Sequence, residues 1–184
     1  MVAKRMLNFG TPNRKRPRRF QQPVMLYRSI KPEMKNLVTT LAYGPAINLT
    51  LGLNVVSQGA ATFERIGSKI KIWRIDYMIE NVNNSNAVRV TLQIPNIVGA
   101  ASTQNFASSV DRESFTLLKD TIYHSGTAQS PRGILQSHQL PVGVVSKYAG
   151  VAGTTINHNQ IQARITTSGT ETLSGYFRIW YTDV

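Results

Sequence analysis

The chain has 184 residues, which is long enough for one domain with a core but too short for two enzyme domains. Of these residues 41% are hydrophobic, so the chain is expected to fold. It contains 21 Lys and Arg against 9 Asp and Glu, and this net charge of +12 predicts a polyanionic partner, with nucleic acid favoured over a membrane. The absence of cysteine excludes disulfide scaffolds, thiolate zinc sites, iron–sulfur clusters and cysteine nucleophiles.

Residues 1–35 hold three quarters of the net charge, since they contain ten basic residues and the single acid Glu33. Four prolines and the lack of a strand or helix period predict a flexible arm there, followed by a folded domain over residues 36–184. An unfolded basic segment neutralises phosphates without reading bases. The residues expected to do so are Lys4, Arg5, Arg14, Lys15, Arg16, Arg18 and Arg19.

The densest part of this arm also has the composition of a nuclear localisation signal, formed by Arg14, Lys15, Arg16, Pro17, Arg18 and Arg19. A solvated tail without a specific role is the alternative interpretation. No apolar run is long enough to span a membrane, and no secretory leader is evident, so a cytosolic or nuclear protein is expected.

After the arm, short runs alternate between apolar and polar residues, which is typical of half-buried strands. The clearest lie at residues 47–55, 88–94, 161–165 and 177–181, and further strands are expected near 36–43, 68–80, 115–123, 134–140 and 142–148. The alternation changes phase near Trp73, which predicts a β-bulge or burial on both faces. Since no helices of crossover length intervene, the sequence predicts an antiparallel sandwich or barrel.

Clusters of turn-forming residues separate these runs, at 44–45, 81–86, 99–102, 126–133, 150–153 and 168–172. The one short helical candidate covers residues 108–114, where Ser109 is placed to cap a turn that contains Asp111 and Glu113. The folded domain is therefore expected to be all-β.

A second basic set falls mostly on polar strand positions and consists of Lys69, Lys71, Arg74, Arg89, Arg164 and Arg178. If several share a sheet face, they form an additional phosphate-contacting surface, although isolated basic residues are also common on exposed strands. Arg178 lies between Tyr176 and Trp180, which raises the possibility of stacking with single-stranded bases, although aromatic residues on strands more often pack in a core.

Catalysis has little support in the sequence. His124, His138 and His158 are isolated, and no metal-binding, P-loop, dinucleotide or hydrolase motif occurs. We expect neither an enzyme nor a bound cofactor or metal.

Three segments resemble the capsid proteins of small, circular, Rep-encoding single-stranded DNA viruses, the circovirus-like group. The most specific is Val56-Ser57-Gln58-Gly59 followed by Glu64-Arg65-Ile66-Gly67-Ser68-Lys69-Ile70-Lys71-Ile72. Two shorter ones are Leu118-Lys119-Asp120 and Ile179-Trp180-Tyr181-Thr182-Asp183. With the basic arm, the resemblance covers roughly residues 14–184.

The resemblance implies a single eight-stranded antiparallel jelly roll with a disordered basic N-terminal arm. It implies that many copies, 60 in the smallest case, close into an icosahedral shell with T=1 around a single-stranded DNA genome, with RNA as a further possibility. The arm would face the genome, host nuclear import machinery would be a partner, and no membrane would be involved. The expected locations are the virion and the host nucleus.

Two other functions remain open on the residues alone. A non-viral or RNA-virus nucleic-acid-binding β-barrel with a basic tail would remain a monomer and place base-stacking aromatics on one exposed sheet face. A carbohydrate-binding jelly roll would leave the basic arm without a purpose.

Overall fold

The computed structural model has an all-β fold over the residues it describes, which are 33–61, 63–81, 86–97, 100, 102–124, 134–149 and 154–184. The chain divides into two units, Met1–Lys31 and Pro32–Val184, and everything described here belongs to the second. Its strands are β1 (Lys35–Gly52), β2 (Lys69–Asn81), β3 (Val88–Pro95), β4 (Phe115–Tyr123), β5 (Ile134–Tyr148), β6 (Ile156–His158) and β7 (Gln162–Asp183). No helix occurs within the described ranges.

The longest strand, β7, pairs with three others, and all pairs in the sheet are antiparallel. Its second half pairs with β2 and with the first half of β1, and β5 continues the sheet beyond β2. Its first half pairs with β3 and with the second half of β1, and β4 follows β3. We call these two groups of four strand segments the β2–β5 half and the β3–β4 half.

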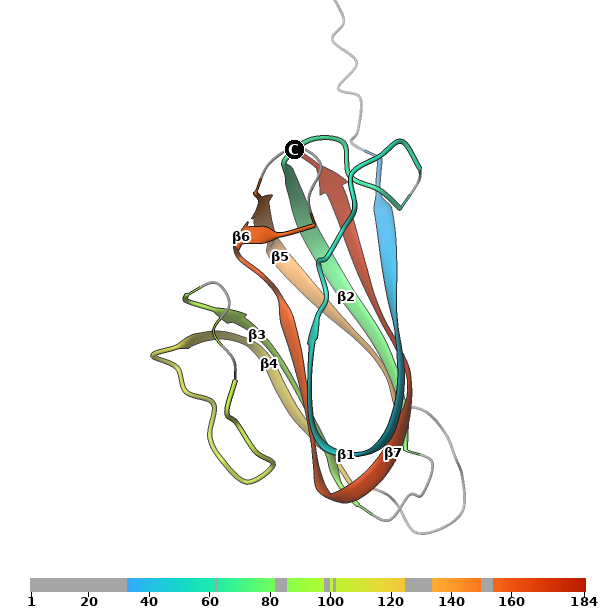
Figure 1. Cartoon of the computed structure of the whole chain (residues 1–184), viewed down its shortest axis with the longest axis vertical. Coiled ribbons are helices and arrows are strands. Elements are labelled where there is room, and N and C mark those ends of the chain that lie inside the picture. Colours follow the sequence, from blue (N-terminus) through green and yellow to red (C-terminus); the bar gives the residue numbers. More distant parts are fainter. Residues whose placement is uncertain are drawn as a thin grey trace, which may run out of the picture. The chain divides into compact units, whose positions relative to one another are not determined.

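Both β1 and β7 bend as they pass from one half to the other, and Figure 1 shows the two bends together at the lower end of the sheet. The register of β1 against β7 shifts between Tyr43 and Asn48. The sequence predicted turns at residues 44–45 and 168–172, and this prediction is wrong, because both stretches continue as strand. Glycine, proline and small polar residues permit a sharp bend within a strand as well as a turn between strands.

The two halves enclose one hydrophobic core. The inner side chains of β2 alternate with outer ones, and Ile75, Tyr77 and Ile79 are at most 1% exposed. Val90 and Leu92 face them from β3 in the same cluster. A hydrogen bond of 2.6 Å between the hydroxyl groups of Tyr77 and Tyr123 joins the halves directly. Each half therefore buries its inner face and leaves its outer face to another segment or to solvent.

The outer face of the β3–β4 half is covered by residues 102–114, so that every residue of β3 is buried. This segment is not helical, and the predicted helix at 108–114 is therefore wrong. Asp111, rather than Ser109, caps the turn there, because its carboxylate accepts the backbone N–H groups of Glu113 and Ser114. A local cap of this kind stabilises a turn without extending it into a helix.

The other strand predictions are confirmed in position, with some differences at their ends. Residues 36–43 and most of 47–55 form the single strand β1, which ends at Gly52. Residues 134–140 and 142–148 are also one strand, β5, and 161–165 and 177–181 both belong to β7. The sequence missed β6, whose three residues are too few to show a period.

Candidate nucleic-acid interface

A β-bulge in β2 places two consecutive large side chains on the outer face of the β2–β5 half. The pairing of β2 shifts register between Ile72 and Arg74 against both of its neighbours, which confirms the predicted bulge at Trp73. One extra residue on one strand reverses the alternation beyond it. Lys71 therefore points outward before the bulge and Asp76 after it, while the buried residues change from even to odd numbers.

Aromatic rings and cations alternate across this outer face. On β7, Trp180 pairs with Arg74 of β2, and Arg178 pairs with Asp76. The Arg74 guanidinium carbon lies 4.5 Å from the centre of the Trp180 ring, and the Arg178 guanidinium carbon lies 5.9 Å from it. Arg178 is also 5.4 Å from the Tyr176 ring. The aromatic rings are thus exposed to cations on one face of the sheet rather than packed in the core.

The polar edge of each indole is held by a neighbouring strand. The Trp180 Nε1–H donates to Asp76 Oδ2 at 2.6 Å, and the same oxygen lies 3.0 Å from Arg74 Nη2. The Trp73 Nε1–H donates to the Thr182 hydroxyl at 3.1 Å, and Lys71 Nζ lies 4.2 Å from the centre of its ring. These bonds fix the orientation of both rings before any ligand arrives.

A pocket of about 280 Å³ opens between the two indoles, lined by Met34, Trp73, Arg74, Gln139 and Trp180. Trp73 and Trp180 are the two tryptophans of the whole chain. Beside the pocket, three buried polar atoms have no hydrogen-bond partner among the described residues, namely Arg74 Nε, Asp76 Oδ1 and Arg178 Nε. We call this site the indole pocket.

Among the residues that the structure describes, five cations and two acids lie on the outer face of the β2–β5 half, which we call the cationic face. They are Lys69, Lys71, Arg74, Lys147 and Arg178, with Asp76 and Glu80. Lys147 was missed by the sequence analysis, because only the pairing of β5 with β2 places it directly opposite Lys69. Like charges opposite one another destabilise a sheet, so this pair favours an anion between them.

The predicted second basic set is therefore divided by the fold. Lys69, Lys71, Arg74 and Arg178 share the cationic face, whereas Arg89 and Arg164 lie on the β3–β4 half. The predicted arm residues Lys4, Arg5, Arg14, Lys15, Arg16, Pro17, Arg18 and Arg19 lie outside the described residues.

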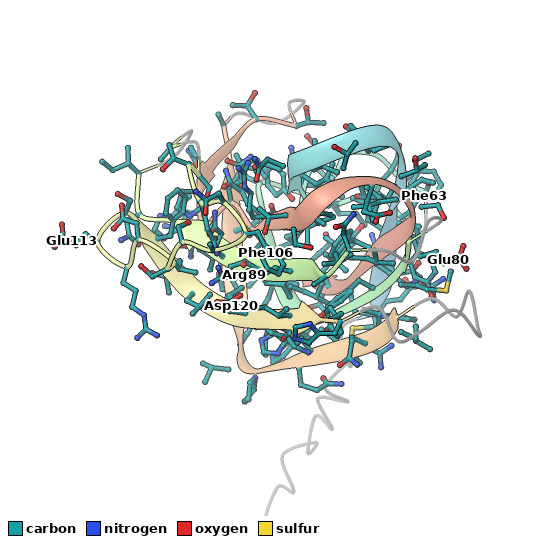
Figure 2. The ribbon with its side chains drawn as sticks, turned by 90° about the horizontal axis from the view of Figure 1, so that it is seen from below. Phe63, Glu80, Arg89, Phe106, Glu113 and Asp120 are labelled. Atoms are coloured by element: carbon teal, nitrogen blue, oxygen red, sulfur yellow. The ribbon has the colours of Figure 1, made fainter. Side chains whose placement is uncertain are left out.

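Arg89 and Arg164 make internal hydrogen bonds that hold the covering segment 102–114. Arg89 is bonded to Asp120 and donates to the backbone carbonyls of Phe106 and Ser108, at 2.9 and 2.5 Å. Figure 2 shows Arg89 between Phe106 and Asp120. Arg164 donates to the Gln104 carbonyl from Nε and Nη2, at 3.1 and 2.8 Å. Burial lowers the pKa of Arg164. Both guanidinium groups are bonded to other residues of the chain, so we do not assign them to phosphate.

The first and last of the three motifs behind the family resemblance close one end of the sheet, whereas Leu118-Lys119-Asp120 lies within β4. Arg65 is fully buried, with its guanidinium carbon 4.0 Å from the centre of the Tyr148 ring, and it donates to the backbone carbonyls of Val56 and Gly67. Asp183 forms an ion pair of 2.8 Å with Lys35 and accepts the Ile66 N–H at 2.9 Å. These residues act in folding, and they join the loop after β1 to the end of β7.

The described residues contain no cluster of three side chains suited to a metal ion. His138 lies within β5 and is half-buried rather than in a loop, and burial, with Lys119 nearby, lowers its pKa. His124 and His158 are exposed. Among the described residues, no helix has the length and apolarity needed to cross a membrane.

No protein-family model matches the chain, and no curated protein was found to match it.

Proposed function

We propose that this protein is the coat subunit of a small icosahedral shell that packages a single-stranded DNA genome. The observation that carries the proposal is the strand order. The first half of β1, the second half of β7, β2 and β5 form one group, and the second half of β1, the first half of β7, β3 and β4 form the other. If β1 and β7 are each counted as two strands, this order supports an eight-stranded jelly roll, an architecture used by viral capsid domains.

The basic N-terminal segment supports packaging. Residues 1–35 hold a net charge of +9, and sixty such segments would supply about 540 positive charges to one enclosed polymer. Tethering many weak cationic segments to one shell raises their effective concentration around the genome. The cluster from Arg14 to Arg19 would also direct the subunit to the nucleus through the host import machinery.

The cationic face is the second contact that we assign to the genome. The chain enters the fold at Lys35, and β1 begins in the β2–β5 half that bears this face. We assign both the basic segment and the cationic face to the same ligand, the enclosed genome. The subunit then acts by binding and assembly, and we assign it no catalytic residue, cofactor or membrane contact.

A second candidate is a monomeric nucleic-acid-binding β protein with a basic tail. The half-buried aromatic rings of Trp73, Tyr176 and Trp180 on one outer face favour it, because single-strand binders stack bases on such rings. A carbohydrate-binding jelly roll is less well supported, since neither the basic segment nor the cations of the face would have a role.

Particle mass separates the two candidates. The full chain is expressed, and light scattering is recorded with absorbance at 260 and 280 nm on the same peak. The coat function predicts a particle of roughly 1.2 MDa, sixty copies of the 20.4 kDa chain, whose nucleic acid survives nuclease. A 20.4 kDa species that binds oligonucleotides and stays monomeric at every salt and protein concentration would contradict it and support the second candidate.

A variant with glutamine at Arg14, Lys15, Arg16, Arg18 and Arg19 tests packaging apart from assembly. We expect shells with a lower ratio of absorbance at 260 to 280 nm, because the sheet contacts remain and the phosphate contacts are lost. Arg112→Gln is the matched control, since Arg112 is an exposed cation on the covering segment of the other half. Its particles are expected to contain as much nucleic acid as the wild type.

A further inference from the structure

We propose that the indole pocket binds one unpaired nucleobase, stacked on Trp73 or Trp180, while the phosphates on either side contact Lys71 and Arg178. This inference rests on the proposed function only in taking single-stranded nucleic acid as the partner. It adds a specific base site to the sequence-independent charge of the N-terminal segment.

The two indoles are preorganised for stacking. Each is anchored by its N–H, Trp180 to Asp76 and Trp73 to Thr182, so that binding need not order either ring. Preorganised groups lose less entropy on binding. Lys71 lies over the Trp73 ring and Arg74 over the Trp180 ring, so a base would stack on a ring face that these cations leave open, or take the place of one of them.

The size and chemistry of the pocket suit a single base. Its volume of about 280 Å³ is slightly below the range of roughly 300 to 1,000 Å³ that pockets for drug-sized ligands span, as suits a smaller group. Arg74 and Gln139 line it beside the indoles and supply polar groups for the edge of a base. The buried Arg74 Nε has no partner among the described residues, so a ligand acceptor would satisfy it.

The surroundings of the pocket suit phosphate. Five cations against two acids give the face a positive potential, and the opposed pair Lys69 and Lys147 gains from an anion between its ammonium groups. Arg178 Nε is also buried without a partner in the described part of the chain. Base and backbone can thus be held at adjacent positions of one strand.

This arrangement favours single-stranded nucleic acid. In a duplex the base faces are stacked on one another, so that a base must leave the helix before it can reach an indole. Cationic contacts alone would bind duplex and single strand alike. Discrimination between them is the property that the pocket would add.

Tryptophan emission reports on this site directly, because both tryptophans of the chain line the pocket. Full-length protein, freed of nucleic acid by nuclease and high salt, is titrated with dAMP, with dTMP and with 2-deoxyribose 5-phosphate. A mononucleotide cannot bridge subunits, so assembly does not disturb the signal. We expect saturable quenching by dAMP, weaker quenching by dTMP and none by the sugar phosphate. Equal quenching by the sugar phosphate, or quenching by dAMP that never saturates, would overturn the proposal.

Two leucine variants locate the base. Trp180→Leu and Trp73→Leu each leave the other indole as the reporter. We expect loss of the ring that stacks to lower dAMP affinity at least about fivefold, since stacking contributes about 1–3 kcal/mol per base. Phe63→Ala is the matched control, because Phe63 is a 52% exposed aromatic residue outside this face. Unchanged dAMP affinity in both leucine variants would contradict base binding in the indole pocket.

A conservative substitution at the same position distinguishes loss of base stacking from loss of folding. Trp180→Phe keeps an aromatic ring but loses the N–H that Asp76 accepts, so we expect dAMP binding within about threefold of the wild type. If Trp180→Leu does not fold, Arg178→Gln and Lys71→Gln test the phosphate contacts. Because dAMP carries one phosphate, we expect at least one of the two substitutions to weaken dAMP binding while leaving thermal stability within the range of Phe63→Ala. Unchanged dAMP affinity in both variants would refute the assignment.

The failure of this proposal and of the coat function give different results. If the pocket is wrong and the coat function right, particles of full mass form and dAMP leaves tryptophan emission unchanged. If the coat function is wrong and the pocket right, the protein stays monomeric and dAMP still quenches saturably. A preference for single-stranded over duplex oligonucleotide that is lost in the leucine variants would support the pocket in either case.

Discussion

Arg89 and Asp120 face each other across β3 and β4 with two parallel hydrogen bonds, Nε to Oδ1 at 2.8 Å and Nη2 to Oδ2 at 2.6 Å. The remaining guanidinium nitrogen of Arg89 holds two backbone carbonyls of the covering segment 102–114. A guanidinium suits this role because its planar group donates in several fixed directions at once. One side chain thus joins two strands and a loop.

The substitution Arg89→Lys should therefore destabilise the protein. Arg89→Lys keeps the charge but loses the paired geometry and at least one loop contact, in a side chain that is only 9% exposed. We expect the free energy of unfolding in urea to fall by about 2–3 kcal/mol. Arg112→Lys, the same change at an exposed position, should alter it by less than about 0.5 kcal/mol. Equal effects at both positions would contradict this role for Arg89.

Asp120 should make stability depend on pH. The hydrogen bonds from Arg89 lower the pKa of this carboxyl, so the native state binds a proton more weakly than the unfolded chain. The pair therefore stabilises the native state above the ordinary Asp pKa of about 3.9, and the contribution is lost as pH falls through that value toward the lower native pKa.

The measurement is urea unfolding of wild type and Asp120→Asn at a series of pH values. We expect the difference in free energy of unfolding to be largest near neutral pH and to shrink as pH falls from about 5 to about 2. Glu113→Gln, in which an exposed carboxyl is removed from the same covering segment, should follow the wild type. A difference that stays constant over this range would refute the linkage.

Gly175 should not tolerate a side chain. Its φ of 137° is in the region that favours glycine, and a Cβ atom there would lie 2.0 Å from the Met78 carbonyl oxygen on the neighbouring strand. We expect Gly175→Ala to lower the free energy of unfolding by roughly 2–4 kcal/mol. Gly44→Ala is the control, because a Cβ atom at Gly44 meets nothing within 4 Å. If the melting temperatures of both variants equal that of the wild type, the strands around Gly175 can move apart at little cost in free energy, and the prediction is wrong.

The contributions of the basic segment and the cationic face to phosphate binding can be measured by salt dependence. Affinity for single-stranded oligothymidylate should fall linearly in a double-logarithmic plot against salt, with a slope of about 0.7 for each neutralised phosphate. Glutamine at Arg14, Lys15, Arg16, Arg18 and Arg19 should reduce the slope by about 3 to 4. Glutamine at Lys69 and Lys71 should reduce it by about 1 to 1.5.

The control for these titrations is Arg112→Gln, which removes a cation from the other half of the sheet and should leave the slope unchanged. If Arg112→Gln instead lowers the slope by as much per charge removed as the other two variants do, only net charge matters, and neither the segment nor the face is a specific contact.

Part of the candidate site was predictable from the sequence. The phase change at Trp73 predicted the bulge, and the bulge accounts for the outward direction of both Trp73 and Arg74. Outward positions were also predicted for Arg89 and Arg164, and both do leave the core. Their role was not predictable, because the segment 102–114 that covers them follows β3 in the chain and shows no pattern of its own.

The sequence alone determined the all-β class, the approximate places of the strands, the bulge and the concentration of charge before residue 36. These depend on local properties, since the alternation of side chains follows from the backbone of each strand and charge is a property of composition. The tertiary structure decided that β1 and β7 continue through their bends, that Lys147 lies opposite Lys69, and that Trp73 and Trp180 meet at one pocket. Each of these depends on which distant segments pair or pack together. The spacing of residues along one strand does not specify which strands will be its neighbours in the sheet.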